Sequence, residues 1–301
     1  MLDKESLNQY ITKIQSNKEN NIQFNNIQMD ILNCKIILNH FNTRYLDMNA
    51  HDTILNVNQF FKLITDNSTL INNKHKRFIV NAGDGRTHFA AANVFKDAHN
   101  NISVIFVDSS LGHNQWIFSI LHVLLNNVSN IKTLYIYNKI QNSDGDCLLF
   151  SLHFLKKMYK YRDHFESLHQ DIFHNRIKFT REENEPFDPK IELPNEQLEQ
   201  ARVVYLNKAI KLLPIDFFKH AHSIKPINTY LENHPDETRK KVNKWQGGET
   251  LIDRYHRHKV TRMIKQQTYN NAIEEKQRTY SNSIEEKRLS LAQAALRWLG
   301  E

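Results

Sequence analysis

Cysteine is scarce in this chain, which holds only Cys34 and Cys147 among 301 residues. Two thiols can form at most one disulfide, so the sequence is not that of a disulfide-stabilised scaffold, and a reducing compartment is expected. No cysteine pairs accompany the 16 histidines, which argues against a metal site even though His256 and His258 lie close together. Zinc-finger spacings, RNP-like strands and glycine-rich basic repeats are also missing, so nucleic-acid binding is disfavoured.

Long apolar runs are missing as well. No segment approaches the roughly 18 consecutive apolar residues that cross a bilayer, so we expect no transmembrane segment. Residues 1–7 are polar and charged, unlike the apolar core of a secretory signal peptide, and we expect no cleaved signal. The chain is 40% hydrophobic and 24% charged, which is typical of a globular protein with one large domain or two small ones.

Positive charge exceeds negative charge, with 40 Lys and Arg against 33 Asp and Glu and a formal net charge of +7. Residues 219–301 hold 16 of the basic and 10 of the acidic residues, so most of the excess lies there. A basic surface favours an anionic partner, and nucleic acid, anionic lipid or a polyphosphate metabolite all fit. A solvated helical face with Glu–Lys pairs explains the same charge without any ligand.

Helical and strand patterns follow one another in an order that predicts an α+β fold. Residues 1–60 indicate helices interrupted by the Asn-rich stretch 17–26. We predict strands over 77–82, 88–95, 102–108 and 133–138, with a turn at 83–85 and a hairpin loop at 97–101. We predict helices over 116–125, 147–161, 197–213 and 283–299, a connecting loop over 176–200, and a basic, helical region from residue 219 onward.

Four side chains have the chemistry of nucleophilic catalysis. Cys147 follows a polar, turn-forming run and begins an apolar helix, where unbonded backbone N–H groups favour a thiolate. His88 opens one predicted strand and Asp108 ends the next, so the carboxylate can orient an imidazole that takes the thiol proton. Gln141 lies six residues before Cys147, and its amide could stabilise an oxyanion together with the Cys147 N–H.

Each of these residues also has a purely structural interpretation. A cysteine in an apolar helix is usually a core residue, as we expect for Cys34. His88 is one of 16 histidines, and Asp108 can merely cap a turn. Asp144 and Asp146 can serve as helix N-caps and nothing more. The catalytic interpretation depends on the combination of residues rather than on any one of them.

This combination resembles the clan CE cysteine proteases and, more closely, the YopJ family of bacterial effector acetyltransferases. The resemblance rests on Thr87-His88-Phe89, Phe106-Val-Asp108, and Gln141-x5-Cys147 with the apolar helix after it. The later motifs of the family are similar to Leu213-Pro-x3-Phe218-Lys-His220-x2-Ser223, Gly248-Glu-Thr-Leu-Ile-Asp-Arg254 and Thr279-Tyr-Ser-Asn-Ser-Ile-Glu-Glu-Lys-Arg288. The resemblance covers residue 30 or so to the end, and a protease of the wider clan would not carry the C-terminal motifs.

The chain departs from the family pattern at two positions. Leu148 stands where the family usually has a small residue after the nucleophile, and its side chain is expected to narrow the approach to the thiol. Asp108 stands where the family acid is often Glu, a change that still leaves a carboxylate to orient His88.

The resemblance implies a clan CE (ubiquitin-like-protease-like) catalytic core with a helical regulatory part from the N-terminus and the C-terminal third. The expected divisions are 1–60 for an N-terminal helical segment, 61–215 for the catalytic core and 216–301 for a basic regulatory region. It also implies transfer of acetyl from acetyl-CoA through Cys147 to Ser, Thr or Lys of host proteins in a ping-pong scheme. Such an effector would be secreted by a bacterium into the host cytoplasm, and its expected partners are signalling proteins such as MAP-kinase kinases.

The family depends on host inositol hexakisphosphate, which implies an activator site in the basic region. The residues assigned to cofactor binding are Lys219, His220, Arg254, Arg257, Lys259, Arg262, Lys287 and Arg288. Several Arg and Lys side chains suit multiple phosphates because each makes charge-assisted hydrogen bonds. Lys219 also matches the family position that becomes self-acetylated.

Two other functions stay open at the level of the sequence. A clan CE deubiquitinase or deSUMOylase would share the triad and the fold, but would leave the basic C-terminal region without a purpose. A non-catalytic binding protein is favoured by Leu148 alone. Because acyl-enzyme chemistry is common to proteases and acetyltransferases, the triad does not separate these two classes.

Overall fold

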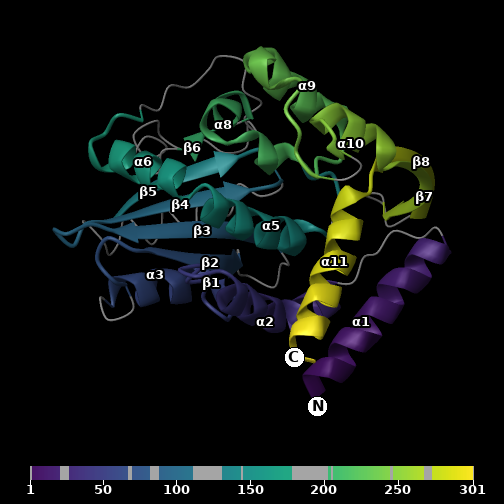
Figure 1. Cartoon of the computed structure of the whole chain (residues 1–301), viewed down its shortest axis with the longest axis horizontal. Coiled ribbons are helices and arrows are strands. Elements are labelled where there is room, and N and C mark those ends of the chain that lie inside the picture. The colour runs from purple at the N-terminus through teal and green to yellow at the C-terminus, as the bar shows by residue number, and fades with distance from the viewer. Residues whose placement is uncertain are drawn as a thin grey trace.

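The computed structural model describes residues 2–20, 27–66, 70–81, 88–110, 131–143, 145–177, 203–204, 206–244, 247–267 and 273–300. The turn predicted at 83–85, the helix predicted at 116–125 and nearly all of the loop predicted at 176–200 lie outside this part. Figure 1 shows a sheet covered by helices, with the helices of the two chain ends packed beside it. This arrangement confirms the α+β class expected from the sequence.

The secondary-structure elements are as follows. The main sheet consists of β1 (Leu55–Asn56), β2 (His75–Asn81), β3 (Phe89–Lys96), β4 (Ile102–Asp108), β5 (Ile131–Tyr137) and β6 (Val203–Val204), and a separate hairpin consists of β7 (Lys259–Gln267) and β8 (Ile273–Ser281). The α-helices are α1 (Leu2–Glu19), α2 (Ile27–Arg44), α3 (Val57–Thr65), α5 (Cys147–Lys160), α6 (Arg162–Phe173), α8 (Leu206–Leu212), α9 (Ile224–Asn233), α10 (Leu251–Arg257) and α11 (Ser283–Trp298). Two short 3-10 helices span Ile215–Phe218 and Pro235–Glu237.

The six strands of the main sheet lie side by side in sequence order. β2, β3 and β4 are antiparallel, whereas β1 runs parallel to β2, and β5 runs parallel to β4 and β6. The predicted hairpin loop closes with the Asp97 N–H donating to the Asn101 carbonyl at 3.0 Å, and Asn100 has a φ of 65°, which Asn tolerates. The register sets Asp108, the last residue of β4, opposite Tyr137 of β5.

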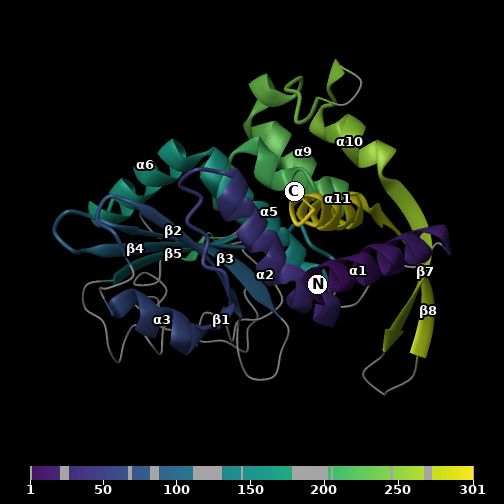
Figure 2. The same cartoon turned by 60° about the horizontal axis from the view of Figure 1, so that its bottom comes forward.

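Both faces of the sheet are covered, because β3 and β4 are buried over their whole length. Side chains alternate between the faces of a strand. In β4, Ile105 and Val107 join the larger core, which contains α5, whereas Val104 and Phe106 join the smaller core, which contains α3. Figure 2 shows the sheet between α3 on one side and α2, α5 and α6 on the other. Burial on both faces explains the uninterrupted apolar run of this strand in the sequence.

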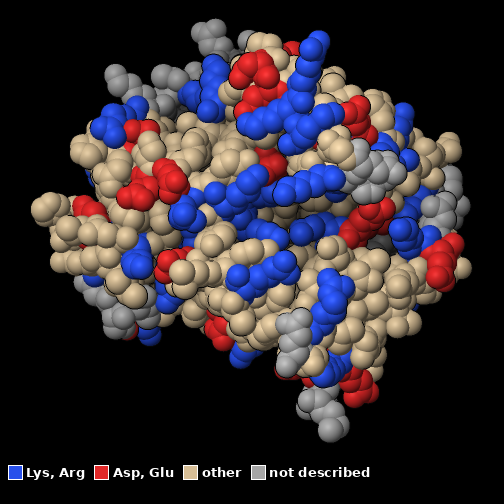
Figure 3. Space-filling model, viewed as in Figure 1, with Lys and Arg blue, Asp and Glu red and all other residues tan. Residues whose placement is uncertain are grey.

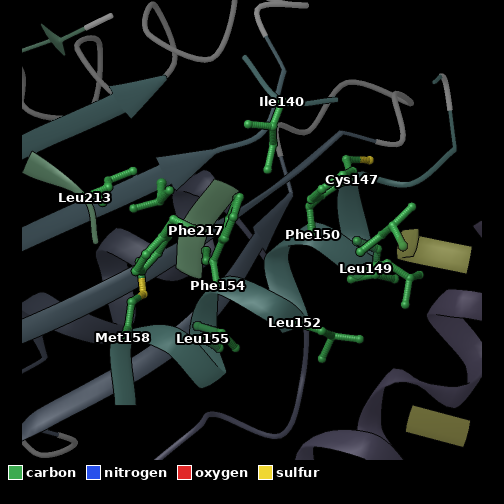
Figure 4. Close-up of a cluster of buried hydrophobic side chains, with 14 of the residues drawn as sticks. Ile140, Cys147, Leu149, Phe150, Leu152, Phe154, Leu155, Met158, Leu213 and Phe217 are labelled. Atoms are coloured by element: carbon green, nitrogen blue, oxygen red, sulfur yellow. The ribbon is translucent and has the colours of Figure 1, made fainter. Parts of the chain in front are cut away.

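Helix α5 lies at the centre of the larger core. Lys157 and Lys160 in its last turn complement the negative end of the helix dipole. Phe154 is fully buried and stacks on Phe217 with ring centroids 5.5 Å apart. Figure 4 shows Cys147 at the beginning of this helix, with Phe154 further along among the packed apolar side chains. Core packing therefore fixes the direction of the helix that carries Cys147.

The helices at the two ends of the chain pack together although they are far apart in sequence. α1 and α11 lie side by side and antiparallel, with Lys18 Nζ 3.7 Å from Glu286 Oε1 (Figures 1 and 2). α2 packs against both α11 and α5. Cys34 of α2 is buried as predicted, and burial raises the pKa of its thiol. In the part of the chain that is described, no helix has the length and apolarity of a bilayer span.

Two of the predicted elements are wrong in part. The helix predicted over 197–213 corresponds to α8, which begins at Leu206, because the β-branched pair Val203–Val204 adds a strand beside β5. The region from residue 219 onward is not helical throughout, since β7 and β8 pair as an antiparallel hairpin between α10 and α11. The first error depends on pairing with β5, which is distant in sequence and which local propensity does not report, whereas β7 and β8 are neighbours in the chain and their hairpin was assigned to a helical region.

We expect Phe154→Ala to lower the free energy of unfolding by about 3–5 kcal/mol, because a cavity adds to the lost transfer free energy of the ring. Urea denaturation followed by circular dichroism measures this change. The matched control is Leu46→Ala, since the Leu46 side chain is 83% exposed, and its effect should stay within about 0.5 kcal/mol. Similar losses in both variants would contradict a core role for Phe154.

Candidate active site

Cys147, His88 and Asp108 meet at one end of the sheet. Cys147 is the first residue of α5, His88 directly precedes β3, and Asp108 is the last residue of β4. His88 Nε2 lies 2.7 Å from Asp108 Oδ2, and the imidazole is also hydrogen-bonded to the Cys147 thiol. All three residues are between 1% and 6% exposed. The structure thus brings together the three residues selected from the sequence.

Asp108 is held in place by two further donors. The Tyr135 hydroxyl donates to Oδ2 at 2.6 Å, and the Ser110 backbone N–H donates to Oδ1 at 2.9 Å. Burial, together with the charge of Asp108, raises the pKa of Tyr135, so its hydroxyl keeps its proton and stays a donor. Tyr135 is missing from the residues predicted from the sequence. Its position near the end of a buried strand indicates that it could contact the site, but a tyrosine at such a position is usually only a core residue.

Two opposing influences act on His88. Burial lowers the pKa of the imidazole, but the Asp108 carboxylate and the hydrogen bonds to Asp108 and Cys147 outweigh burial and raise the pKa to about 10. At neutral pH the ring therefore carries a proton. The site has the electrostatics of a thiol that is prepared for nucleophilic attack.

The loop between β5 and α5 brings Gln141 beside the end of β4. Lys139 has a φ of 48°, in the left-handed region, and after this turn the Gln141 N–H donates to the Ser109 carbonyl at 2.8 Å. Ser109 Oγ donates to Gln141 Oε1 at 2.6 Å, and Gln141 Nε2 donates to the Ser143 carbonyl. The Gln141 amide therefore fixes the loop that leads to Cys147, and one of its two N–H protons is used there.

Asp146 directly precedes Cys147 but does not act as the predicted N-cap. In the described residues its side chain makes no hydrogen bond to the first turn of α5. It instead accepts a 2.7 Å hydrogen bond from Arg288 Nη2 of α11 and another from Ser143 Oγ. Burial alone would raise the pKa of Asp146, but Arg288 and the other neighbours hold it below its ordinary value. Asp144, the other predicted cap, lies outside the described residues.

Leu148, which departs from the family pattern, is fully buried and belongs to the larger core. Successive residues of a helix point about 100° apart, so this side chain leaves the helix in another direction than that of Cys147. The structure therefore gives Leu148 a packing role, and the expected narrowing of the approach to the thiol is not supported.

Basic side chains gather where α5 and α11 meet the segment that follows α8. We define the basic cluster as Lys156, Lys157, Lys160, Lys219, Arg254 and Lys287. Figure 3 shows Lys and Arg side chains crowded across the middle of this face. Burial and the surrounding cations lower the pKa of Lys287 to about 7, and they lower the pKa of Lys219 to about 8. Asp216 offsets part of the charge, since it accepts hydrogen bonds from Lys157 at 2.9 Å and from Lys160.

Three of the predicted cofactor-binding residues, Lys219, Arg254 and Lys287, belong to the basic cluster. The lysines contributed by α5 are missing from the prediction. The run Lys156-Lys157 is visible in the sequence, but it lies on the helix of the nucleophile and far from the basic C-terminal region. Only the fold brings these two parts of the chain together.

For two of the predicted residues the structure contradicts a ligand-binding role. Arg288 is fully buried and bonded to Asp30 and Asp146. Arg262 is buried as well, and its Nη1 lies 2.9 Å from Glu285 Oε2. Both guanidinium groups are already neutralised inside the protein, so neither presents its charge to a ligand.

The other three predicted residues lie outside the basic cluster. Arg257 forms an ion pair with Glu249. His220 is buried, with its Nδ1 3.1 Å from Ser283 Oγ, and burial holds its pKa well below the ordinary range. Lys259 is exposed at the start of β7. His220 therefore carries no charge at neutral pH, and its assignment to cofactor binding stays a prediction.

Comparison with known proteins identifies the family of this chain. A family model described as YopJ Serine/Threonine acetyltransferase matches residues 7–294. The chain belongs to this family. The YopJ acetyltransferase of Yersinia pestis is 25% identical over 269 residues, which are 86% of this chain and 84% of that protein. The YopJ of Yersinia pseudotuberculosis is 24% identical with the same coverage.

Two solved structures show the same fold at lower sequence identity. AvrA, solved with IP6 and CoA, superposes with a TM-score of 0.76 and 20% identity, and the match covers 98% of this chain and 99% of AvrA. HopZ1a, solved with IP6 and CoA, gives a TM-score of 0.71 and 17% identity, and the match covers 99% of this chain and 97% of HopZ1a. The α+β architecture of this YopJ-family chain is therefore shared from end to end with both proteins.

We expect Asp108→Asn to slow alkylation of Cys147 by iodoacetamide roughly tenfold or more near neutral pH, because loss of the carboxylate lowers the pKa of His88 and returns the proton to sulfur. The difference should shrink above about pH 8.5, where a thiol ionises without help. Mass spectrometry assigns the label to Cys147 or to the buried Cys34. Asp163→Asn is the control, since the Asp163 side chain is 95% exposed. Equal rates at all pH values would contradict the ion-pair interpretation.

Proposed function

We propose that this chain transfers acetyl from acetyl-CoA to Ser, Thr or Lys side chains of host proteins through an acetyl-Cys147 intermediate. The observation that carries the proposal is the buried array of Cys147, His88 and Asp108 at the start of α5, in a chain of an acetyltransferase family. The AvrA and HopZ1a structures solved with CoA support acetyl-CoA as the donor.

The geometry suits two successive acyl transfers. In the first, the Cys147 thiolate attacks the acetyl carbonyl, the bond between carbonyl carbon and CoA sulfur breaks, and His88 gives its proton to the departing thiolate. In the second, the acceptor hydroxyl or amine attacks the thioester while His88 takes its proton, and Cys147 leaves as a thiolate. Asp108 stabilises the imidazolium at both ends of the cycle through its 2.7 Å contact with Nε2.

Groups around the start of α5 would stabilise the oxyanion of the tetrahedral intermediates. The Cys147 N–H belongs to the first turn of α5, whose N–H groups point out of the N-terminal end of the helix. The Gln141 amide lies in the loop that leads to Cys147 and uses one proton for Ser143, so the other can be donated to an oxyanion. We assign these two donors to the tetrahedral intermediates.

The basic cluster fits a polyphosphate activator. Burial and the neighbouring cations lower the pKa of Lys287 to about 7, and bound phosphates would offset the repulsion among these cations through charge-assisted hydrogen bonds. AvrA and HopZ1a are solved with IP6. We infer that inositol hexakisphosphate binds to the basic cluster and activates acetyl transfer.

The setting of the reaction is carried over from the family. The curated relatives are YopJ proteins of Yersinia. We infer that a bacterium delivers this chain into the host cytoplasm, where it acts on signalling proteins, with MAP-kinase kinases as the first substrates to assay.

The first test uses labelled acetyl-CoA with and without inositol hexakisphosphate. We expect wild type to acquire label mainly with the activator, and Cys147→Ala to acquire none, because no acyl-enzyme can form. Cys34→Ala is the matched control: it removes the other thiol, which lies in α2, and it should keep activity. Intact-mass and peptide mass spectrometry report the label. Labelling that persists in Cys147→Ala would contradict the proposal.

The second test concerns the activator site. We expect Lys287→Gln to weaken binding of inositol hexakisphosphate about 10- to 100-fold, since a charge-assisted hydrogen bond is lost. Lys259→Gln should leave binding within roughly threefold, because Lys259 is exposed outside the cluster. Isothermal titration calorimetry measures both.

The same titration has a pH dependence. Bound phosphates favour the charged forms of Lys287 and Lys219, whose pKa values are lowered to about 7 and about 8 in the ligand-free protein. Binding must therefore take up protons around these values, and affinity should fall as pH rises through them. An affinity that rises with pH over this range would contradict the site.

A further inference from the structure

Arg288 of α11 is fully buried and is shared by two carboxylates. Its Nε donates to Asp30 Oδ1 at 3.0 Å and its Nη2 to Asp30 Oδ2 at 3.1 Å, the fork geometry that suits a carboxylate. Nη2 also donates to Asp146 Oδ1 at 2.7 Å. The Tyr10 hydroxyl of α1 donates to Asp30 as well. One guanidinium therefore connects α1, α2, α11 and the loop before α5.

Asp146 is the last residue of the loop before α5. Groups from two segments of the chain lie beside its carboxylate. Ser143 Oγ donates to Asp146, and His222 Nε2 lies 3.8 Å from Asp146 Oδ2. The Asn142 N–H donates to His222 Nδ1 at 3.1 Å, and burial lowers the pKa of His222 to about 4. The neutral ring therefore carries its proton on Nε2, which in the described residues makes no hydrogen bond and lies 3.8 Å from Asp146 Oδ2. The chain immediately before Cys147 is thus fixed by contacts with two distant segments.

The direction of the Asp146 carboxylate is unusual for its position. An Asp directly before a helix ordinarily bonds the first-turn N–H groups, where the helix dipole also favours it. Here the carboxylate bonds Arg288 and, in the described residues, makes no hydrogen bond to the first turn of α5. The guanidinium also offsets a negative charge that would disfavour a thiolate at the next residue.

We propose that Asp146 and Arg288 are positioning residues for Cys147. Arg288 fixes Asp146, and with it the first turn of α5, to the helices of both chain ends, so that the sulfur is held against His88. The inference rests on the role of Cys147 as the nucleophile. Buried ion pairs select one arrangement of the segments they join, and a small displacement of reacting groups lowers a rate strongly.

Asp146→Asn and Asp30→Asn form a matched pair, because each removes one carboxylate from the same guanidinium with little change in shape. We expect Asp146→Asn to slow alkylation of Cys147 by iodoacetamide about tenfold at neutral pH, and Asp30→Asn to slow it less than about threefold. Removal of a negative charge beside the sulfur favours the thiolate, so electrostatics alone predict faster alkylation of Asp146→Asn. Slower alkylation therefore reports a loss of position.

Ser143→Ala is a milder variant for the case that Asp146→Asn does not fold. Circular dichroism measures whether Asp146→Asn is folded. Ser143→Ala removes one hydrogen bond from the Asp146 carboxylate and leaves every charge in place, and it should slow alkylation about threefold. In acetyl transfer, both variants should lower kcat while the KM for acetyl-CoA stays within about twofold, because the donor site is unchanged.

Alkylation of Asp146→Asn or, if that variant is unfolded, of Ser143→Ala at the wild-type rate or faster would overturn the inference. Equal losses in Asp146→Asn and Asp30→Asn would also overturn it, since they indicate general destabilisation. A different result would contradict the proposed function: wild-type Cys147 is alkylated rapidly, but no acetyl is transferred from acetyl-CoA. Alkylation does not require acetyl-CoA, so the comparison of variants still decides whether Asp146 positions the thiol.

Discussion

The contact of Arg288 with Asp30 and Asp146 is the interaction on which the rest of the arrangement depends. A guanidinium without exposed surface loses its hydration, and the two carboxylates that contact it offset that loss in the native fold. The three partners lie at positions 30, 146 and 288, which places one in a helix near each end of the chain and one directly before Cys147. The packing of the terminal helices and the placement of the nucleophile therefore share a single buried contact.

Two adjacent residues of helix α11, Lys287 and Arg288, lie in different charged surroundings. Arg288 points to carboxylates and is neutralised by them, whereas Lys287 points to cations, which together with burial lower its pKa to about 7. Neighbouring positions on a helix point about 100° apart, which is enough to separate these surroundings. The first environment holds segments of the chain together, and the second gathers positive charge. The basic cluster and the residue before Cys147 thus both contact one helix.

Much of the fold and the triad could be predicted from the sequence, because their signals are local. The run that ends in Asp108 is a strand buried on both faces, and the polar run before Cys147 marks the beginning of a helix. The strand Val203–Val204 was not predicted, since it depends on pairing with β5, which is distant in sequence, and the local hairpin β7–β8 was assigned to a basic, helical region. Tyr135 was not predicted for a related reason: its hydroxyl contacts Asp108 only because of the register between β4 and β5.

By itself the sequence determined the reactive chemistry of this protein: a thiol at the start of a helix, an imidazole and a carboxylate at strand ends, and a surplus of positive charge in the last third. Only the tertiary structure decided which charges are available to a ligand. Arg288 and Lys287 are consecutive in one basic run, yet one is neutralised inside the protein and the other faces like charges. The physical reason is that the role of a charge depends on its hydration and on its partners, and both are set by segments far apart in the chain.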